Sequence, residues 1–294
     1  MKKELLRLHF LIAVLAFTGL LGDIIVVDAF QLVWFRTLFA SLGLFALLIL
    51  FKRRIKLATK NILIYLSIGM TIGLHWICFF HSIDISTISL GVGCLASASL
   101  FTSILEPLHF GRRVLLSEVV ISLMVIVGLY IIFQFEFRYS LGILFATTSA
   151  FLGAWFTVLN KKYIKKEDDM LSITFYEILG AFLTVAIIQW LRGEHQMFAF
   201  ELSANDWICI LILALICTCW AFWEQVYLVK YLSAFVIVLS FNLEPVYGML
   251  IGALMGEEMT SGFYLGAGLI LFSIAIYPIV KKKHFGLKKR KKVV

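Results

Sequence analysis

Apolar runs of about 20 residues recur from one end of this chain to the other, and they constrain its fold more than any other feature. A helix of about 20 apolar residues crosses the ~30 Å hydrocarbon core of a bilayer. Only helices and closed barrels satisfy their backbone polar groups there, and barrel strands alternate apolar and polar residues. These runs do not alternate. We therefore expect an all-α polytopic membrane protein.

Composition supports this expectation. Hydrophobic residues make up 62% of the 294 residues and charged residues 15%. A soluble domain has about 45–50% apolar and about 25% charged residues. The composition therefore argues against a globular core with a hydrated surface.

Ten transmembrane spans are predicted. The first follows Lys2, Lys3 and Arg7 and resembles a signal peptide, but its length and the lack of a small-residue cleavage site favour a retained span. The spans are expected at residues 8–27, 31–51, 62–82, 87–108, 115–134, 140–159, 171–191, 207–227, 232–254 and 262–280.

Positive charge alternates between the loops. Of the 26 basic residues, only Arg36, Arg138 and Arg192 fall outside the loops and ends of one predicted side. The positive-inside rule therefore predicts that both termini are cytoplasmic. The net charge of +8 follows from this asymmetry, so we expect no nucleic-acid partner. The basic tail would either anchor the topology or attract anionic lipid.

The two halves of the chain contain similar short sequences. "AFTG" at 16–19 matches "AFLG" at 150–153, "WFRTLFASL" at 34–42 matches "FYEILGAFL" at 175–183, and Leu-Glu-Pro occurs at 105–107 and 243–245. Such matches in the same order indicate duplication. Five spans per half make the second repeat inverted, as in transporters that bind substrate between the repeats. We assign residues 1–139 to the first repeat, 140–281 to the second and 282–294 to a basic cytoplasmic tail.

This layout resembles the drug/metabolite transporter superfamily, specifically its EamA-like branch. The best local match is "NLEPVYGMLIGALMGEEMTSGFYLGAGLILFSI" at 242–274, and Arg36 lies at a position common in the family. The first half departs from the pattern, because "FGRRVLLSE" at 110–118 replaces the usual apolar stretch and "GE" loop. The resemblance implies export of small metabolites or drugs through a central cavity, without ATP hydrolysis.

Charged residues inside the spans are functional candidates, because each costs about 2.5–3.5 kcal/mol at a helix centre on insertion scales. Arg36 and Glu177 occupy equivalent positions in the two repeats. Arg36 would either bind a substrate carboxylate or reach the outer interface beside Asp28. For Glu177, a cytoplasmic gate or a pair with a loop lysine is favoured over substrate contact.

The two Glu-Pro pairs are expected at helix kinks, because proline frees the carbonyl four residues earlier. Glu244, beside Pro245 and halfway along its span, is a candidate proton carrier or partner for a substrate amine. A helix-locking role is its alternative, and for Glu106 beside Pro107 that alternative is preferred. Asn242 is the expected hydrogen-bonding neighbour of Glu244.

Aromatic residues complete the candidate site. Trp76 and Trp220 are repeat equivalents, and Trp223 and Glu224 follow in the eighth span. The rings would cover the apolar part of a substrate while Glu224 binds its polar part. Packing within the membrane is their alternative role. The histidines and the five cysteines lack the spacing of a metal site, and we predict no catalytic residue, metal or cofactor.

We therefore predict a secondary-active exporter of a small metabolite, such as an amino acid or another amphipathic compound, working by alternating access. Proton coupling rests on Glu244. The alternatives are an intramembrane lipid-modifying enzyme or a membrane scaffold. The enzyme would leave the inverted repeat unexplained, and the scaffold would not require charged residues at several membrane depths. We expect a monomer or homodimer in a bacterial inner membrane.

Overall fold

A computed structural model describes residues 2–53, 55, 57–134, 139–193, 202–254 and 260–290. The side chains of residues 19, 20, 23, 249, 251–254 and 283–290 are not described. Throughout the described ranges the regular secondary structure is helical, as expected from the apolar runs.

Helices make up most of the described chain. In chain order they are α1 (Lys2–Ile24), α2 (Ala29–Leu50), α3 (Thr59–Asp84), α4 (Ile88–Cys94), α5 (Ser97–His109), α6 (Leu116–Phe133), α7 (Ser140–Tyr163), α8 (Met170–Leu191), α9 (Ala204–Ala214), the π-helix η2 (Leu215–Trp220), α10 (Ala221–Val229), α11 (Ala234–Phe241), α12 (Glu244–Leu254) and α13 (Ser261–Arg290).

Eight helical segments of the described chain are long and apolar enough to cross a membrane, and they coincide with eight of the ten predicted spans. The predicted first span coincides with most of α1. The predicted ninth span contains the shorter apolar segment Ala234–Gly248. That these two also cross the bilayer stays a prediction. The chain is an integral membrane protein with several membrane-spanning helices.

The predicted fourth and ninth spans are each divided into two helices. In the ninth, α11 ends at Phe241 and α12 begins at Glu244, so Pro245 lies in the first turn of a new helix, where proline is tolerated. In the fourth, the division lies between Cys94 and Ser97, whereas α5 continues through Pro107 to His109. The two prolines therefore occupy different structural positions despite their shared sequence motif.

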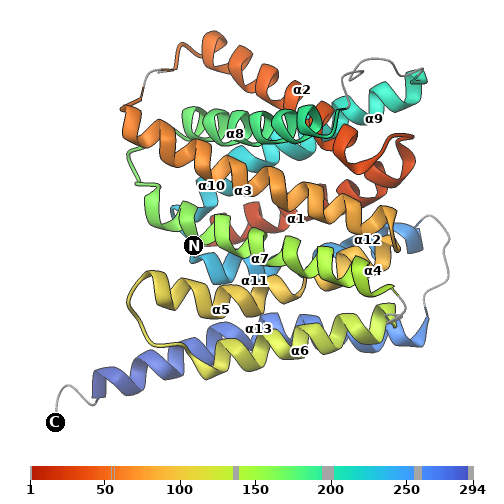
Figure 1. Cartoon of the computed structure of the whole chain (residues 1–294). Coiled ribbons are helices and arrows are strands. Elements are labelled where there is room, and N and C mark those ends of the chain that lie inside the picture. The colour runs from red at the N-terminus through yellow and green to blue at the C-terminus, as the bar shows by residue number, and fades with distance from the viewer. Residues whose placement is uncertain are drawn as a thin grey trace.

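The helices pack with their axes mostly across the view of Figure 1. Helix α3 lies along both α7 and α8, α2 also packs against α8, and α13 lies beside α6 at the opposite edge of the molecule (Figure 1). Helix α13 extends past the other helices toward the C-terminus (Figure 1).

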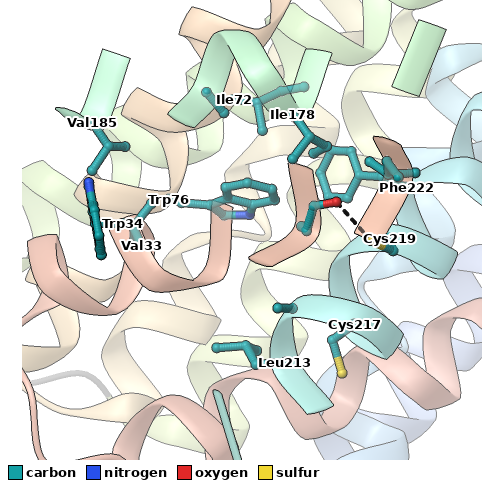
Figure 2. Close-up of a cluster of buried hydrophobic side chains, with 14 of the residues drawn as sticks. Val33, Trp34, Ile72, Trp76, Ile178, Val185, Leu213, Cys217, Cys219 and Phe222 are labelled. Atoms are coloured by element: carbon teal, nitrogen blue, oxygen red, sulfur yellow. Dashed lines mark hydrogen bonds between the residues drawn. The ribbon is translucent and has the colours of Figure 1, made fainter. Parts of the chain in front are cut away.

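A cluster of buried apolar side chains joins α2, α3, α8, η2 and α10 (Figure 2). The indole of Trp76 lies within it, and its ring centroid is 4.9 Å from that of Phe222 (Figure 2). The Cys219 thiol donates to the carbonyl of Ala40, 3.1 Å away, and this hydrogen bond ties η2 to α2 (Figure 2). All five cysteines are free thiols, and each is buried or half-buried, as expected for packing residues.

Candidate functional site

A cavity of about 130 Å³ lies between the two halves of the chain. Residues of α1 to α7 and of α10 to α12 line it. Its walls are mostly apolar, and its principal polar side chains are Arg36, His75, Gln225, Asn242 and Glu244. An apolar cavity of about 150 Å³ binds benzene, so this one matches a small molecule.

Arg36 is the most deeply buried charged group of the cavity, with 1% of its surface exposed. Its Nε donates to the Thr218 hydroxyl at 2.6 Å, and its Nη2 donates to the carbonyl of Cys217 at 3.2 Å. Its Cζ lies 4.1 Å from the centroid of the Trp76 ring, which gives a cation–π contact. Arg36 therefore does not reach the outer interface, and Asp28 instead caps α2 by accepting from the Gln31 amide.

Both protein partners of the guanidinium come from η2. A π-helix is rare and is frequently found at functional sites, because it shifts the backbone hydrogen bonds of a helix by one residue. Here it places the Cys217 carbonyl and the Thr218 hydroxyl toward Arg36. No pattern in the sequence predicts a π-helix here, so these two partners of Arg36 were not predicted.

One nitrogen of Arg36, Nη1, is buried and has no hydrogen-bond partner among the described residues. No described carboxylate lies within ion-pair distance of the guanidinium, although the charge of Glu244 acts on it. A buried cation with spare hydrogen-bonding capacity is a candidate binder of an anionic group.

Glu244 lines the same cavity from the first turn of α12. Asn242 lies in the short connection before it, and its amide donates to the carbonyls of Val238 and Leu239 at 3.3 and 3.0 Å. The Asn242 amide thus binds two carbonyl groups near the C-terminal end of α11, and neither hydrogen bond involves Glu244. The predicted candidates Arg36, Trp76, Asn242, Glu244 and Pro245 all line this cavity.

Two further polar residues of the cavity were not among the main sequence candidates. His75 Nδ1 lies 2.8 Å from the carbonyl of Ser149, which holds the ring against α7 and leaves Nε2 for another partner. Gln225 is 4% exposed, and its Nε2 has no hydrogen-bond partner among the described residues. The direction in which an isolated polar residue of an apolar helix faces is difficult to predict from the sequence.

Trp220, Trp223 and Glu224 do not line the central cavity. Both carboxylate oxygens of Glu224 accept hydrogen bonds from Arg7, at 2.5 Å each, so the two side chains form a bidentate ion pair between α10 and α1. The Arg7 guanidinium also lies 3.7 Å from the centroid of the Tyr227 ring. Trp220 and Trp223 instead line two other pockets, of about 660 and 510 Å³, which are more open than the central cavity.

Glu106 also lies outside the cavity lining. One of its oxygens accepts from the Phe235 amide at 2.9 Å, and the other pairs with Arg112 at 2.8 Å. Glu106 therefore adds to the capping of the N-terminus of α11, where Ser233 is the N-cap, and a carboxylate is stabilised there. This arrangement matches the helix-locking alternative of the sequence analysis.

Glu177 is buried between α8, α7 and α3, away from the central cavity. Its described hydrogen-bond partner is Asn160, and no described lysine lies within ion-pair distance. Among the described residues, no group of three or more His, Cys, Asp or Glu side chains could hold a metal ion.

Comparison with known proteins matches the second half of the chain to a known family. Residues 140–277 match the model of the EamA-like transporter family. These residues of the chain belong to that family. The matched range nearly coincides with the predicted second repeat, and the resemblance to the drug/metabolite transporter superfamily is confirmed. EamA-like proteins are transporters, so the match indicates a membrane transporter of small molecules.

A solved structure described only as the crystal structure of a protein is similar in fold to this chain. Its TM-score is 0.77 at 13% sequence identity, and the match covers 95% of this chain and 98% of the other. The two share one fold over nearly their whole length. No curated protein matches the chain in sequence.

Proposed function

We propose that this EamA-like protein is a secondary-active transporter that exports a small zwitterionic metabolite, such as an amino acid, through the central cavity. One observation carries the proposal. Arg36 is basic and Glu244 is acidic, and the two line the same small cavity without forming a direct ion pair. A zwitterion complements both groups, its carboxylate binding the guanidinium and its ammonium binding the carboxylate.

The walls of the cavity favour an apolar side chain on this substrate. Trp76, Phe79 and Phe222 all line it, and each is at most 5% exposed. Apolar pockets with a few convergent polar groups are typical small-molecule sites. The cavity volume of about 130 Å³ favours a small amino acid over a bulky drug.

Alternating access between two inverted repeats is part of the proposal. Two features support it. The fourth and ninth predicted spans are both divided near the cavity, and α2 packs against α8 just as α6 packs against α13, which are equivalent spans in the two repeats. Discontinuous helices at the repeat interface are typical of secondary transporters. The positive-inside pattern supports cytoplasmic termini in a bacterial inner membrane.

Exchange from sealed proteoliposomes tests the proposed function. Vesicles would be loaded with a mixed pool of L-amino acids, their N-acetyl derivatives and their amides, and retained compounds would be measured by mass spectrometry. Selective loss of zwitterions from vesicles that contain the protein is expected. Loss of the N-acetyl derivatives and amides at the same rate as the zwitterions would contradict the two-charge site.

Two variants make this test specific. Glu244→Gln removes the carboxylate charge and should weaken zwitterion exchange at least tenfold, since hydrogen bonds to charged groups contribute about 1.5–3 kcal/mol. Glu106→Gln removes an equivalent charge outside the cavity. It should lower stability and leave the apparent KM of exchange unchanged.

A further inference from the structure

Glu177 and Asn160 form a buried polar pair that the transport proposal has not used. Glu177 on α8 is fully buried, and Asn160 on α7 is 1% exposed. The Asn160 Nδ2 donates to Glu177 Oε2 at 3.3 Å. The other oxygen of each side chain, Glu177 Oε1 and Asn160 Oδ1, is buried and has no hydrogen-bond donor among the described residues.

Both unpartnered atoms are acceptors, so one proton would satisfy both. A protonated carboxyl group has an O–H donor, whereas an ionised one only accepts. With the proton on Oε1, Glu177 would donate to Asn160 Oδ1 while Asn160 Nδ2 donates to Oε2. The result is a carboxylic acid–carboxamide pair with two antiparallel hydrogen bonds and no unpaired atom.

Among the described residues, the lack of a cation beside Glu177 favours its neutral form. On α3, the hydroxyl of Tyr65 lies within electrostatic range of Glu177 and of Asp168 in the α7–α8 loop. On α7, the Nζ of Lys161 donates to the Val229 carbonyl at 2.7 Å. Among the described residues no charged group of α2 or α10, the other helices against α8, acts on Glu177. A fully buried carboxylate without a cation is strongly disfavoured in its ionised form.

We propose that Glu177 is a proton-binding site, occupied as a carboxylic acid paired with Asn160, and that its proton is the one coupled to transport. The coupling half of this proposal rests on the proposed transport function. The site is distinct from the cavity, so proton and substrate need not compete for one carboxylate, as they would at Glu244.

The packing provides a mechanical link between the two sites. Helix α3 contacts α8 backbone to backbone at Gly69, where any Cβ would overlap the Glu177 carbonyl. Two helical turns further along α3 lies Trp76, which contacts Arg36 in the cavity. When the Glu177 O–H bond breaks and its proton passes to water, a buried negative charge remains on α8. We expect α8 to shift against α3 to hydrate that charge, and α3 carries Trp76 with it.

A route for the proton runs toward the α7–α8 loop. Asp168 is half-buried there, and the Tyr65 hydroxyl lies within electrostatic range of both carboxyl groups. Tyr65 is thus a positioning residue between the buried acid and water. Tyr65→Phe should slow proton exchange at Glu177 without removing the proton site.

Infrared spectroscopy of the purified full-length protein in lipid tests the proton directly. At neutral pH, the difference spectrum between wild type and Glu177→Gln should contain one carboxylic acid C=O band, and that band should shift in Asn160→Ala because its hydrogen bond is lost. Glu177→Gln preserves the pair as two carboxamides, so folding is retained. A difference spectrum with carboxylate bands in place of the acid band would overturn the proposal.

Transport against a pH gradient tests the coupling. The zwitterion that exchanges fastest in the proteoliposome assay would be the probe. Wild type should accumulate it in response to a pH gradient, whereas Glu177→Gln should exchange it at equal pH and fail to accumulate it. The proposed coupling would be overturned if Glu177→Gln accumulated the zwitterion in a pH gradient, or if wild-type exchange did not respond to that gradient. Absence of any wild-type exchange would overturn the proposed function and leave the infrared result standing.

Discussion

The Arg36 guanidinium stacks on the Trp76 ring, with 4.1 Å between Cζ and the ring centroid, and both side chains line the central cavity. A desolvated cation–π contact contributes about 2 kcal/mol. The contact leaves the edge of the guanidinium free for other groups. Trp76 therefore orients the cation that the proposed substrate carboxylate would bind.

Removal of the aromatic face should weaken substrate binding. Trp76→Leu is expected to raise the apparent KM for the zwitterionic substrate by about five- to thirtyfold, the equivalent of about 1–2 kcal/mol. Trp76→Phe keeps a ring and should have a smaller effect. Exchange rates in proteoliposomes at several substrate concentrations would measure both variants. Equal effects of the two substitutions would show that volume and not the ring face matters.

The hydrogen bond from Arg36 Nε to Thr218, 2.6 Å long, holds the guanidinium in place. Thr218→Val removes the hydroxyl at nearly constant volume and should lower kcat/KM about tenfold, since a hydrogen bond to a charged group contributes about 1.5–3 kcal/mol. Thr218→Ser keeps the hydroxyl and should retain most of the activity. If Thr218→Val transports like wild type, the π-helix does not position Arg36 for binding.

The ion pair between Arg7 and Glu224 joins α1 to α10 at the end of the molecule that carries the N-terminus. In an alternating-access cycle this pair would break when that end opens. Glu224→Gln is expected to change the turnover rate and not the substrate affinity, because Glu224 lies outside the cavity lining. The exchanged pair Arg7→Glu with Glu224→Arg should restore much of the wild-type rate.

Salt provides an independent measurement for the same pair. Arg7 has 27% of its side chain exposed, so its ion pair is partly screened by salt. Wild-type turnover should therefore depend on ionic strength more strongly than turnover of Glu224→Gln. An equal salt response in both proteins, or a change confined to KM, would contradict a gating role.

The sequence predicted the general architecture well, because hydrophobic length is a direct physical requirement of the bilayer. The helical segments reproduce the predicted span boundaries to within a few residues for α2, α3, α6 and α8. The break in the fourth span was not predicted. The Leu-Glu-Pro motif drew attention to Pro107, whereas the chain leaves its helix at Leu95–Ala96, where no proline marks the break.

The candidate site was predicted in part. Arg36, Trp76, Asn242 and Glu244 converge on the cavity, since intramembrane polar residues avoid lipid and face the protein interior. Glu224 has the same sequence character but pairs with Arg7, more than 200 positions away. Asn160 was not predicted as a site residue, because its proposed role depends on a carboxylate from another helix. Partners across helices are fixed by packing, which a single sequence does not record.

Close packing of α3 against α8 predicts a sharp difference between two glycines. A Cβ at Gly69 would overlap the carbonyl oxygen of Glu177, whereas a Cβ at Gly268 on α13 would meet no described atom within 4 Å apart from its chain neighbours and its own helix backbone. Overpacking of a rigid contact costs about 1–3 kcal/mol, and an alanine in place of glycine in a helix contributes about 0.5–1 kcal/mol. Gly69→Ala should therefore lower stability, and Gly268→Ala should leave it unchanged or raise it slightly.

Thermal unfolding of the two variants in the same detergent would measure this difference. Gly69→Ala is expected to lower Tm by several degrees and, because α8 must move away from α3 at Glu177, to reduce gradient-driven transport as well. Gly268→Ala should keep both the wild-type Tm and the wild-type transport. If Gly69→Ala keeps the wild-type Tm, then α3 and α8 tolerate a wider separation, and the proposed mechanical link from Glu177 to Trp76 is too loose to couple the two sites.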